Sequence, residues 1–427
     1  MKVGMISLGC DKNRVDSEKM LALLASAGFE ITDDASEAEA VIINTCAFIE
    51  SAKREAIDNI LSAAKLKDGK LKYLVVTGCF AQRYGKIADF PEVDLFLDIS
   101  EEKNIVRHLN ELSRENAPIV CADAGRILTT PAHYAYLKIA DGCNNRCTYC
   151  AIPYIRGNYV SAPIEELVKE AQRLCDEGVK ELILVAQDTT NYGADLYGKP
   201  SLVRLLKELV KIDFWKIRIL YAYPELIDDE LIDFIAQNDR MAQYLDIPMQ
   251  HADPAVLKKM NRRGSADLSA LVSRIRNKVP SITIRSTFIC GFPYETEAEH
   301  EVLLDFLRDG VDFGGFFAYS PEEGTPAYEW KNRANKRTVS RWVKECQAVQ
   351  TQKTLASQRR FEGKTIEVLY EGIDYAKQSF FGRSEHNAPE VDTKIYFTAD
   401  FPLDVGKVYN VRIDEASFDL FGVAVKE

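Results

Sequence analysis

The chain has 427 residues, of which 46% are apolar and 28% are charged, and its formal net charge is −11. This length allows two to four domains with a sizeable core. The negative charge argues against a broad electrostatic attraction to nucleic acid, although a local basic patch could override the total, and it fits a basic partner.

No apolar run reaches the roughly 18 residues that a membrane span needs. The N-terminal sequence runs directly into an apparent strand and has no secretory signal pattern. We therefore expect a cytoplasmic protein with no membrane partner. Ten cysteines in such a chain indicate metal binding or catalysis more strongly than they indicate disulfide bonds.

The first 117 residues alternate between strand and helix patterns. Apolar strands are predicted at 3–8, 41–44, 73–77 and 93–99, and helices at 16–27 and 48–64. Continuous apolar strands that alternate with helices are typical of an α/β fold with a doubly wound parallel sheet.

One cysteine follows each of the first three predicted strands, namely Cys10, Cys46 and Cys79. Because the ends of parallel strands meet at one edge of a sheet, the three thiols are expected to converge there. Each lies in a small or polar turn, where the backbone can approach a cluster closely. The alternative is three buried, inert cysteines, the commoner fate of a single free thiol.

Residues 118–128 are predicted to be a linker, and Cys121 within it has no assigned role. The alternation resumes over 129–360, with strands predicted at 136–140, 182–186, 217–222, 244–248, 283–290 and 315–319. Six β/α units predict a partial (β/α)6 barrel of the TIM type, whose active site lies at the carboxyl ends of the strands. The patterns around Cys175, Cys290 and Cys346 place these three residues in the core.

A second group of three cysteines, Cys143, Cys147 and Cys150, has the spacing C-x3-C-x2-C and follows the first strand of this region. Three thiolates on one loop can hold three irons of a 4Fe-4S cubane and leave the fourth iron open, whereas electron-transfer clusters normally have four cysteines. The alternative is a zinc site whose fourth ligand lies elsewhere in the chain.

Polar residues follow the other strands of the predicted barrel. They include Gln187 and Asp188, Tyr223, Gln250 and His251, and the stretch 320–326. Such residues are the expected lining of a cofactor and substrate pocket. Each could instead cap a loop, and a lone histidine such as His251 is more often structural.

Residues 361–427 have short β-type runs at 365–370, 394–397, 408–413 and 421–425, which predict a small antiparallel barrel. This segment contains thirteen acidic and seven basic residues. An acidic barrel is expected to repel tRNA and to attract a basic protein.

The spacing of Cys143, Cys147 and Cys150 after a strand resembles the radical S-adenosylmethionine (SAM) superfamily. The resemblance implies that these cysteines hold a 4Fe-4S cluster whose open iron binds SAM. Reduction would then cleave SAM to methionine and a 5′-deoxyadenosyl radical. It also implies that Tyr149 lies beside SAM, and the strand-end residues Gln187, Asp188 and Gln250 are expected to line the same pocket.

The whole layout resembles the methylthiotransferases, with an N-terminal cluster domain (1–117), a radical SAM core (129–360) and a TRAM domain (361–427). The stretches 8–18, 246–252 and 388–392 are similar to the RimO-type branch, which modifies an aspartate of small-subunit ribosomal protein twelve. The resemblance implies two 4Fe-4S clusters and two SAM molecules per turnover. It further implies a reductant such as flavodoxin or ferredoxin, and a methylthio group added to the aspartate β-carbon.

Two other functions compete with this interpretation. A tRNA-adenosine methylthiotransferase shares the clusters and differs in its target, which makes tRNA the alternative substrate. A protein of another class would hold iron–sulfur or zinc without catalysis and bind RNA through its C-terminal barrel. Iron and sulfide analysis, together with SAM cleavage after reduction, distinguishes the second class.

Overall fold

The computed structural model describes residues 1–86, 90–114, 117–118, 125–262 and 267–426. Their contacts define two compact units. The first unit contains Met1–Pro131, Asp141–Val160 and Ser320–Tyr328, and the second contains the remaining segments. Most of the predicted linker, including Cys121, lies outside the described residues. No helix within these ranges is both long and apolar enough to cross a lipid bilayer.

The first unit is built on a five-stranded parallel sheet with the order β2-β1-β3-β4-β5. Its strands are β1 (Lys2–Ser7), β2 (Glu30–Thr32), β3 (Ala40–Thr45), β4 (Tyr73–Thr77) and β5 (Leu95–Phe96). The predicted parallel sheet is confirmed. The sequence missed β2, which has only three residues, and β5 is shorter than the predicted strand at 93–99.

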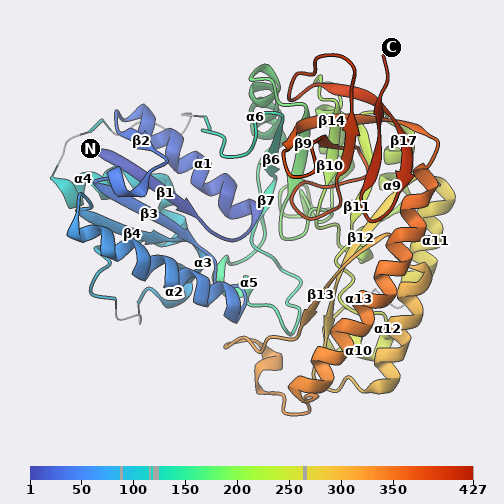
Figure 1. Ribbon diagram of the computed structural model, residues 1–427. Helices are drawn as coiled ribbons and strands as arrows, with labels where there is room; N and C mark the ends of the chain where they lie inside the picture. The colour runs from blue at the N-terminus through green and yellow to red at the C-terminus, as the bar shows by residue number, and fades with distance from the viewer. Residues whose placement is uncertain (87–89, 115–116, 119–124, 263–266, 427) are drawn as a thin grey trace. The chain divides into compact units, whose positions relative to one another are not determined.

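Helices cover both faces of this sheet (Figure 1). They are α1 (Asp11–Ser26) and α4 (Ile105–Ser113) on one face, and α2 (Glu50–Ala64) and α3 (Gly78–Tyr84) on the other. Successive strand residues point to opposite faces, so Ile42 packs with Met20 of α1 while Val41 and Ile43 pack with Ile60 of α2. This arrangement is the predicted doubly wound fold.

The first helix begins five residues before its predicted start at Asp16. Cys10 has extended backbone angles and immediately precedes the helix, and Asp11 supplies a negative charge to the first turn. The first turn is polar, and its apolar periodicity starts only at Val15, which explains why the sequence pattern missed it.

The second unit contains a six-stranded parallel sheet with the order β13-β12-β11-β10-β9-β6. Its strands are β6 (Tyr134–Lys138), β9 (Glu181–Val185), β10 (Lys216–Ile219), β11 (Met241–Asp246), β12 (Thr283–Cys290) and β13 (Phe313–Ala318). The connecting helices include α6 (Ile164–Asp176), α8 (Leu202–Leu209), α9 (Asp229–Gln237), α10 (Pro254–Lys259), α11 (Leu268–Lys278) and α12 (Glu297–Asp309). This confirms the partial barrel. Cys290 and Cys346 are fully buried with their sulfurs 3.8 Å apart, as predicted for core residues, whereas Cys175 is half-buried.

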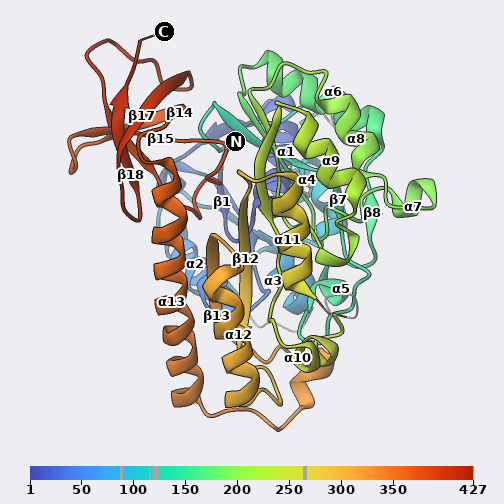
Figure 2. The same cartoon turned by 90° about the vertical axis from the view of Figure 1, so that its right-hand side faces the viewer.

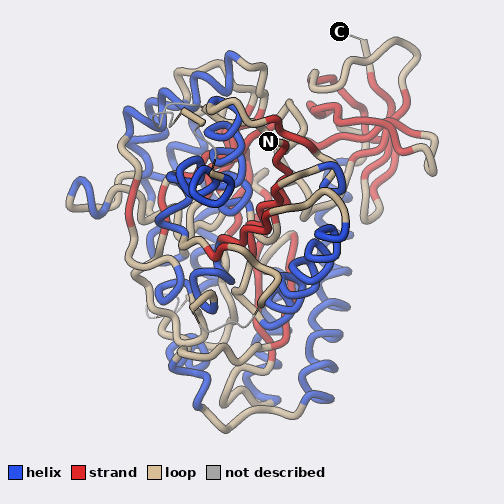
Figure 3. The backbone as a smooth tube through the Cα atoms, turned by 90° about the vertical axis from the view of Figure 1, so that its left-hand side faces the viewer, coloured by secondary structure: helices blue, strands red, loops and turns tan. Residues whose placement is uncertain are grey.

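A long helix, α13 (Lys336–Gln358), runs beside α12 and leads into a closed barrel of five strands (Figure 2). These strands are β14 (Thr365–Asp374), β15 (Ser379–Arg383), β16 (Ile395–Thr398), β17 (Val408–Ala416) and β18 (Leu420–Ala424). Four of them were predicted. The missed strand, β15, has five residues and pairs with β14 across a short turn, so it is too short to give a clear alternation. The strands of the barrel lie together near the C-terminus (Figure 3).

The C-terminal barrel is joined to the amino ends of the parallel strands by a buried ionic network. The fully buried Arg218 donates to Glu181 at 2.6 Å. Arg383, at the end of β15, pairs at 2.8 Å with both Glu181 and Glu371. In such a network the attraction between the paired charges offsets the cost of removing them from water. The network lies at the end of the sheet opposite to the carboxyl ends.

The stretch 388–392, which resembles the RimO-type branch, forms part of the same junction. Asp392 accepts hydrogen bonds from the Tyr244 hydroxyl at 2.6 Å and from Arg285 at 2.9 Å. Its carboxylate also accepts from the backbone N–H of Ala388 at 2.8 Å. These residues therefore hold the two parts of the second unit together.

The junction also corrects the charge argument for residues 361–427. Four of the thirteen acids and one of the seven bases contact the parallel sheet or each other at the junction; they are Glu371, Glu385, Glu390, Asp392 and Arg383. The negative excess of the remaining residues falls from six to three. The expected repulsion of tRNA is correspondingly weaker than the sequence total predicts.

The junction buries a histidine that we expect to make the protein sensitive to acid. Burial, together with the nearby charges of Arg360, Arg218 and Lys216, lowers the pKa of His386 to about 3. In the unfolded chain this group has a pKa of about 6.5. The unfolded state therefore binds one more proton, and stability falls by about 1.4 kcal/mol per pH unit as the pH drops from about 6.5 towards 3.

Urea unfolding of the full chain between pH 5 and pH 7.5 measures this slope. We expect His386→Gln to have a smaller slope than the wild type below pH 6.5. The matched control is His108→Gln, which removes a histidine on the surface of α4 in the first unit. Equal slopes for wild type and His386→Gln would contradict the prediction.

Candidate cluster and cofactor site

The first cysteine triad lies at one edge of the N-terminal sheet. Cys10 follows β1, Cys46 follows β3, and Cys79 lies in the first turn of α3, directly after β4. Since β1, β3 and β4 are neighbours in the sheet, the three residues lie side by side, as predicted. Cys46 and Cys79 are buried and Cys10 is half-buried.

Two glycines make the tight turns of this edge possible. Gly9 has φ +92°, and a Cβ on it would lie 2.6 Å from the Cβ of Cys46. Gly78 has φ +84°, and its Cβ would lie 2.5 Å from the carbonyl oxygen of Thr45. Asn13 links the turns, because its amide donates to that same carbonyl at 2.9 Å. A side chain at either glycine would be strained and would push the triad apart.

A buried arginine from another part of the chain reaches this edge. The Arg156 side chain is 1% exposed and donates to the Asn13 side chain at 2.5 Å, to Asp16 at 3.3 Å and to Asp141 at 2.7 Å. Although burial disfavours its charge, Asp16 and Asp141 hold its pKa well above the usual value. Sequence reasoning missed Arg156, since no periodicity or spacing distinguishes it.

The thiols of the triad influence one another's ionisation. Burial raises the pKa of Cys79 to about 12; Arg156 opposes this shift, whereas Cys46 and Cys10 add to it. Burial likewise raises the pKa of Cys46. Thiols of this kind remain protonated until a metal binds, and metal binding then releases protons.

The second triad lies on an excursion of the chain that is closed at its base by β7 (Ala140–Asp141) and β8 (Val160–Ser161). Within it, the Cys143 N–H donates to the Gly157 carbonyl at 3.2 Å, and the Cys150 N–H donates to the Cys147 carbonyl at 3.0 Å. Cys147 is buried, and the other two are half-buried.

Asp141 connects this excursion to the first triad. One carboxylate oxygen of Asp141 accepts from the N–H of Gly142, immediately before Cys143, at 2.8 Å. The other oxygen accepts from Arg156, which also contacts Asn13. Both triads belong to the first unit, and Arg156 with Asp141 links the segments that carry them.

The donor chemistry of both triads fits iron–sulfur clusters. Within the described ranges, no group of three or more His, Cys, Asp or Glu side chains is arranged to hold a metal ion as it stands. A cubane imposes a different geometry from that of a single ion, because each thiolate binds a different iron. Three soft thiols, the close backbone approach at Gly9 and the buried cation Arg156 meet the needs of such a cluster at the first triad.

The predicted SAM residues lie in both units. Tyr149 is half-buried in the excursion of the first unit. Gln187 and Asp188 follow β9 in the second unit, with Asp188 buried. One oxygen of Asp188 accepts from the Thr190 hydroxyl at 2.7 Å and from the N–H of Asn191 at 3.1 Å, so this carboxylate shapes the turn.

Gln250 follows β11 with φ +73°, a conformation that is strained for a residue other than glycine. Its N–H donates to Thr287 at 2.8 Å and its carbonyl accepts from Ile289 at 2.8 Å, so its backbone prolongs the sheet. The next residue, His251, is fully buried with Nε2 3.3 Å from Glu295. This surrounding fits the structural role expected of a lone histidine.

The stretch 320–326 was predicted to line the pocket of the barrel, and the structure places it in the first unit. There Glu322 pairs with Arg83 at 3.1 Å and accepts from the N–H of Glu50 at 3.1 Å. Arg83 also donates to the carbonyl of Ala47, the residue after Cys46, at 3.0 Å. Sequence reasoning missed Arg83, whose role depends on partners distant in the chain.

Comparison with protein families divides the chain into three matching regions. Residues 2–98 match the uncharacterized protein family UPF0004, residues 137–307 match the radical SAM superfamily, and residues 363–425 match the TRAM domain. These matches define the class of the protein as a radical SAM enzyme with a TRAM domain.

Relatives over the full length identify the family more closely. The chain is 44% identical to the ribosomal protein uS12 methylthiotransferase RimO of Acetivibrio thermocellus, over 100% of this chain and 99% of the relative. It is 42% identical to the RimO protein of Thermoanaerobacter sp., over 98% and 99%. The chain therefore belongs to the RimO family of methylthiotransferases, enzymes that transfer alkylthio groups.

Solved structures share the fold at low sequence identity. The radical SAM methyltransferase TsrM of Kitasatospora setae superposes with a TM-score of 0.55 at 15% identity, over 77% of both chains. The cobalamin-dependent radical SAM enzyme OxsB gives a TM-score of 0.51 at 12% identity, over 82% of this chain and 56% of the other. At these identities the likeness concerns the fold alone.

Proposed function

We propose that this enzyme adds a methylthio group to the β-carbon of an aspartate in ribosomal protein uS12, in the cytoplasm. The observation that carries the proposal is the 44% identity to a uS12 methylthiotransferase over the whole chain. The presence of both cysteine triads in the compact first unit supports it. An aspartate β-carbon is not acidic at ordinary pH, so its modification requires the cofactor chemistry of this class.

We further propose that each triad holds one 4Fe-4S cluster. Cys143, Cys147 and Cys150 would bind the cluster that, with SAM and an electron, supplies a carbon-centred radical. Cys10, Cys46 and Cys79 would bind the cluster that supplies sulfur. Arg156 would offset the negative charge of the first triad, Cys10, Cys46 and Cys79, in a buried setting where water cannot do so.

The SAM site is assigned to Tyr149, Gln187, Asp188 and Gln250. Gln187 and Gln250 follow β9 and β11 at their carboxyl ends, the edge at which barrel enzymes bind their ligands. The strained backbone of Gln250 is typical of functional positions. A low-potential protein such as flavodoxin or ferredoxin would supply the electrons.

Mass spectrometry of cellular uS12 and tRNA tests the proposed function. In cells that lack the gene, we expect uS12 to be lighter by the mass difference between one methylthio group and the hydrogen that it replaces. The mass of tRNA nucleosides should not change. Re-expression of the wild type should restore the modification, whereas a chain with Cys10, Cys46 and Cys79 replaced by alanine should not. A methylthio group that disappears from tRNA and not from uS12 would overturn the proposal in favour of the tRNA branch.

A further inference from the structure

A strongly basic stretch stands out in this acidic chain. Between positions 331 and 344 there are six basic residues and no acidic residue, although the net charge of the chain is −11. We call this surface the α13 basic face; it consists of Lys331, Arg333, Lys336, Arg337, Arg341 and Lys344. All six side chains are exposed.

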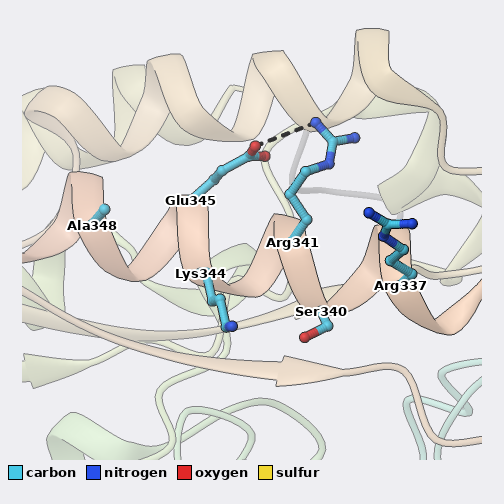
Figure 4. A pocket seen from close by; sticks show the side chains of 6 residues that line it. All are labelled: Arg337, Ser340, Arg341, Lys344, Glu345 and Ala348. Carbon is cyan, nitrogen blue, oxygen red and sulfur yellow. Dashed lines mark hydrogen bonds and ion pairs between the residues drawn. The ribbon is translucent and has the colours of Figure 1, made fainter.

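The helical spacing arranges the four of these cations that belong to α13 along one side of the helix. Arg337 and Lys344 lie seven residues apart on one stripe, which corresponds to about 10 Å along the helix axis. Lys336 and Arg341 lie on either side of this stripe. The opposite side of the helix carries the buried residue Trp342. The exposed side is hollowed into a shallow depression of about 500 Å³ (Figure 4).

Most of these charges are not compensated within the structure. Arg341 pairs with Glu297 and, at 3.3 Å, with Glu345. Arg333 lies over the ring of Tyr319. The remaining four cations form no ion pair with any described residue; they are Lys331, Lys336, Arg337 and Lys344. Even when Glu297 and Glu345 are counted, the face carries a net charge of +4.

Aromatic rings border the basic face at its N-terminal end. The Trp330 and Tyr294 rings are 6.0 Å apart, and Tyr294 is 41% exposed. The Tyr294 N–H donates to the carbonyl of Asn332 at 2.6 Å, so the loop after β12 lies against the start of the basic stretch. Lys259 brings another cation to this place, with its Nζ 4.1 Å from the Tyr294 ring centroid.

We infer that the α13 basic face binds RNA through its phosphodiester backbone. The four cations without an ion pair, Lys331, Lys336, Arg337 and Lys344, can contact several phosphates, and the adjoining aromatic rings can stack on unpaired bases. The rings favour RNA over an acidic protein, for which stacking offers nothing. The inference goes beyond the proposed function and does not depend on it, because RNA binding is measured without turnover.

The test is fluorescence anisotropy of the reconstituted full chain with a labelled single-stranded RNA of about twenty nucleotides, at several salt concentrations. We expect the variant K331E/K336E/R337E/K344E to bind at least tenfold more weakly than the wild type at moderate salt. We also expect the slope of log affinity against log salt to become shallower by about 3, or about 0.7 for each lost phosphate contact.

The matched control is the variant K180E/K199E/R359E/K364E, which makes an equal change in net charge at four other exposed cations of the second unit. It should bind RNA within twofold of the wild type. Equal losses in both variants, or no RNA binding by the wild type, would overturn the inference. Binding of polyglutamate as tight as that of RNA would overturn it in favour of an acidic protein partner. Reductive SAM cleavage by both variants checks that the enzyme is intact.

Discussion

Replacement of Cys143, Cys147 and Cys150 with alanine is expected to abolish reductive cleavage of SAM and to halve the iron content. Replacement of the other triad is expected to halve the iron as well, but to leave SAM cleavage in place and to prevent methylthio transfer. The reason is that the two sets of thiols lie on separate segments of the first unit, and we propose that each set binds its own cluster. Iron and sulfide analysis after anaerobic reconstitution, with chromatography of 5′-deoxyadenosine, measures both effects.

The matched control replaces three cysteines that lie outside both triads, namely Cys175, Cys290 and Cys346. This variant should retain the iron content of the wild type, since these thiols lie in or beside the core of the second unit. A wild-type protein that binds only about four irons per chain, the content of one 4Fe-4S cluster, would contradict the assignment of two clusters.

The second large effect concerns the buried network beneath the parallel strands. We expect Glu181→Gln to destabilise the protein by about 3–5 kcal/mol, because it removes the common partner of the buried Arg218 and Arg383. Both guanidinium groups would then lose their common carboxylate partner in a site that excludes water. Urea unfolding followed by circular dichroism measures the loss of stability.

Glu208→Gln is the control for this prediction. It removes the carboxylate of an exposed pair with Lys211 on α8, and such surface pairs contribute about 0–1 kcal/mol. We also expect a protease to cleave the chain near the C-terminal barrel faster in the Glu181→Gln variant than in the control variant. A loss of less than about 1 kcal/mol for Glu181→Gln would show that the network does not hold the second unit together.

The sequence predicted the sheets because most of their strands are buried on both faces and stand out as continuous apolar runs. It missed β2 and β15, since three and five residues are too few to establish a period. It placed both cysteine triads because strand ends of a parallel sheet share an edge. Arg156 and Arg83 escaped it, since their importance depends on partners that are more than a hundred residues away.

The sequence also overestimated the meaning of net charge. A total over residues 361–427 cannot distinguish an acid on the surface from one that pairs with a buried arginine, as Glu371 does. The opposite error concerns the α13 basic face, whose six cations are hidden in the net charge of −11 of the whole chain. Only the three-dimensional arrangement separates internal charges from those that a partner can meet.

The contact of Arg156 with Asn13 and Asp16 has a consequence for the maturation of the enzyme. During translation, the first strands and all of Cys10, Cys46 and Cys79 leave the ribosome well before Arg156 does. The N-terminal sheet can form at that stage, but its thiols lack the buried cation that balances them. On the proposal that the first triad holds a cluster, insertion is most favourable once Arg156 has emerged and packed beside Asn13. The order of the chain would thus delay the delivery of iron to the N-terminal site until the second triad has also been synthesised.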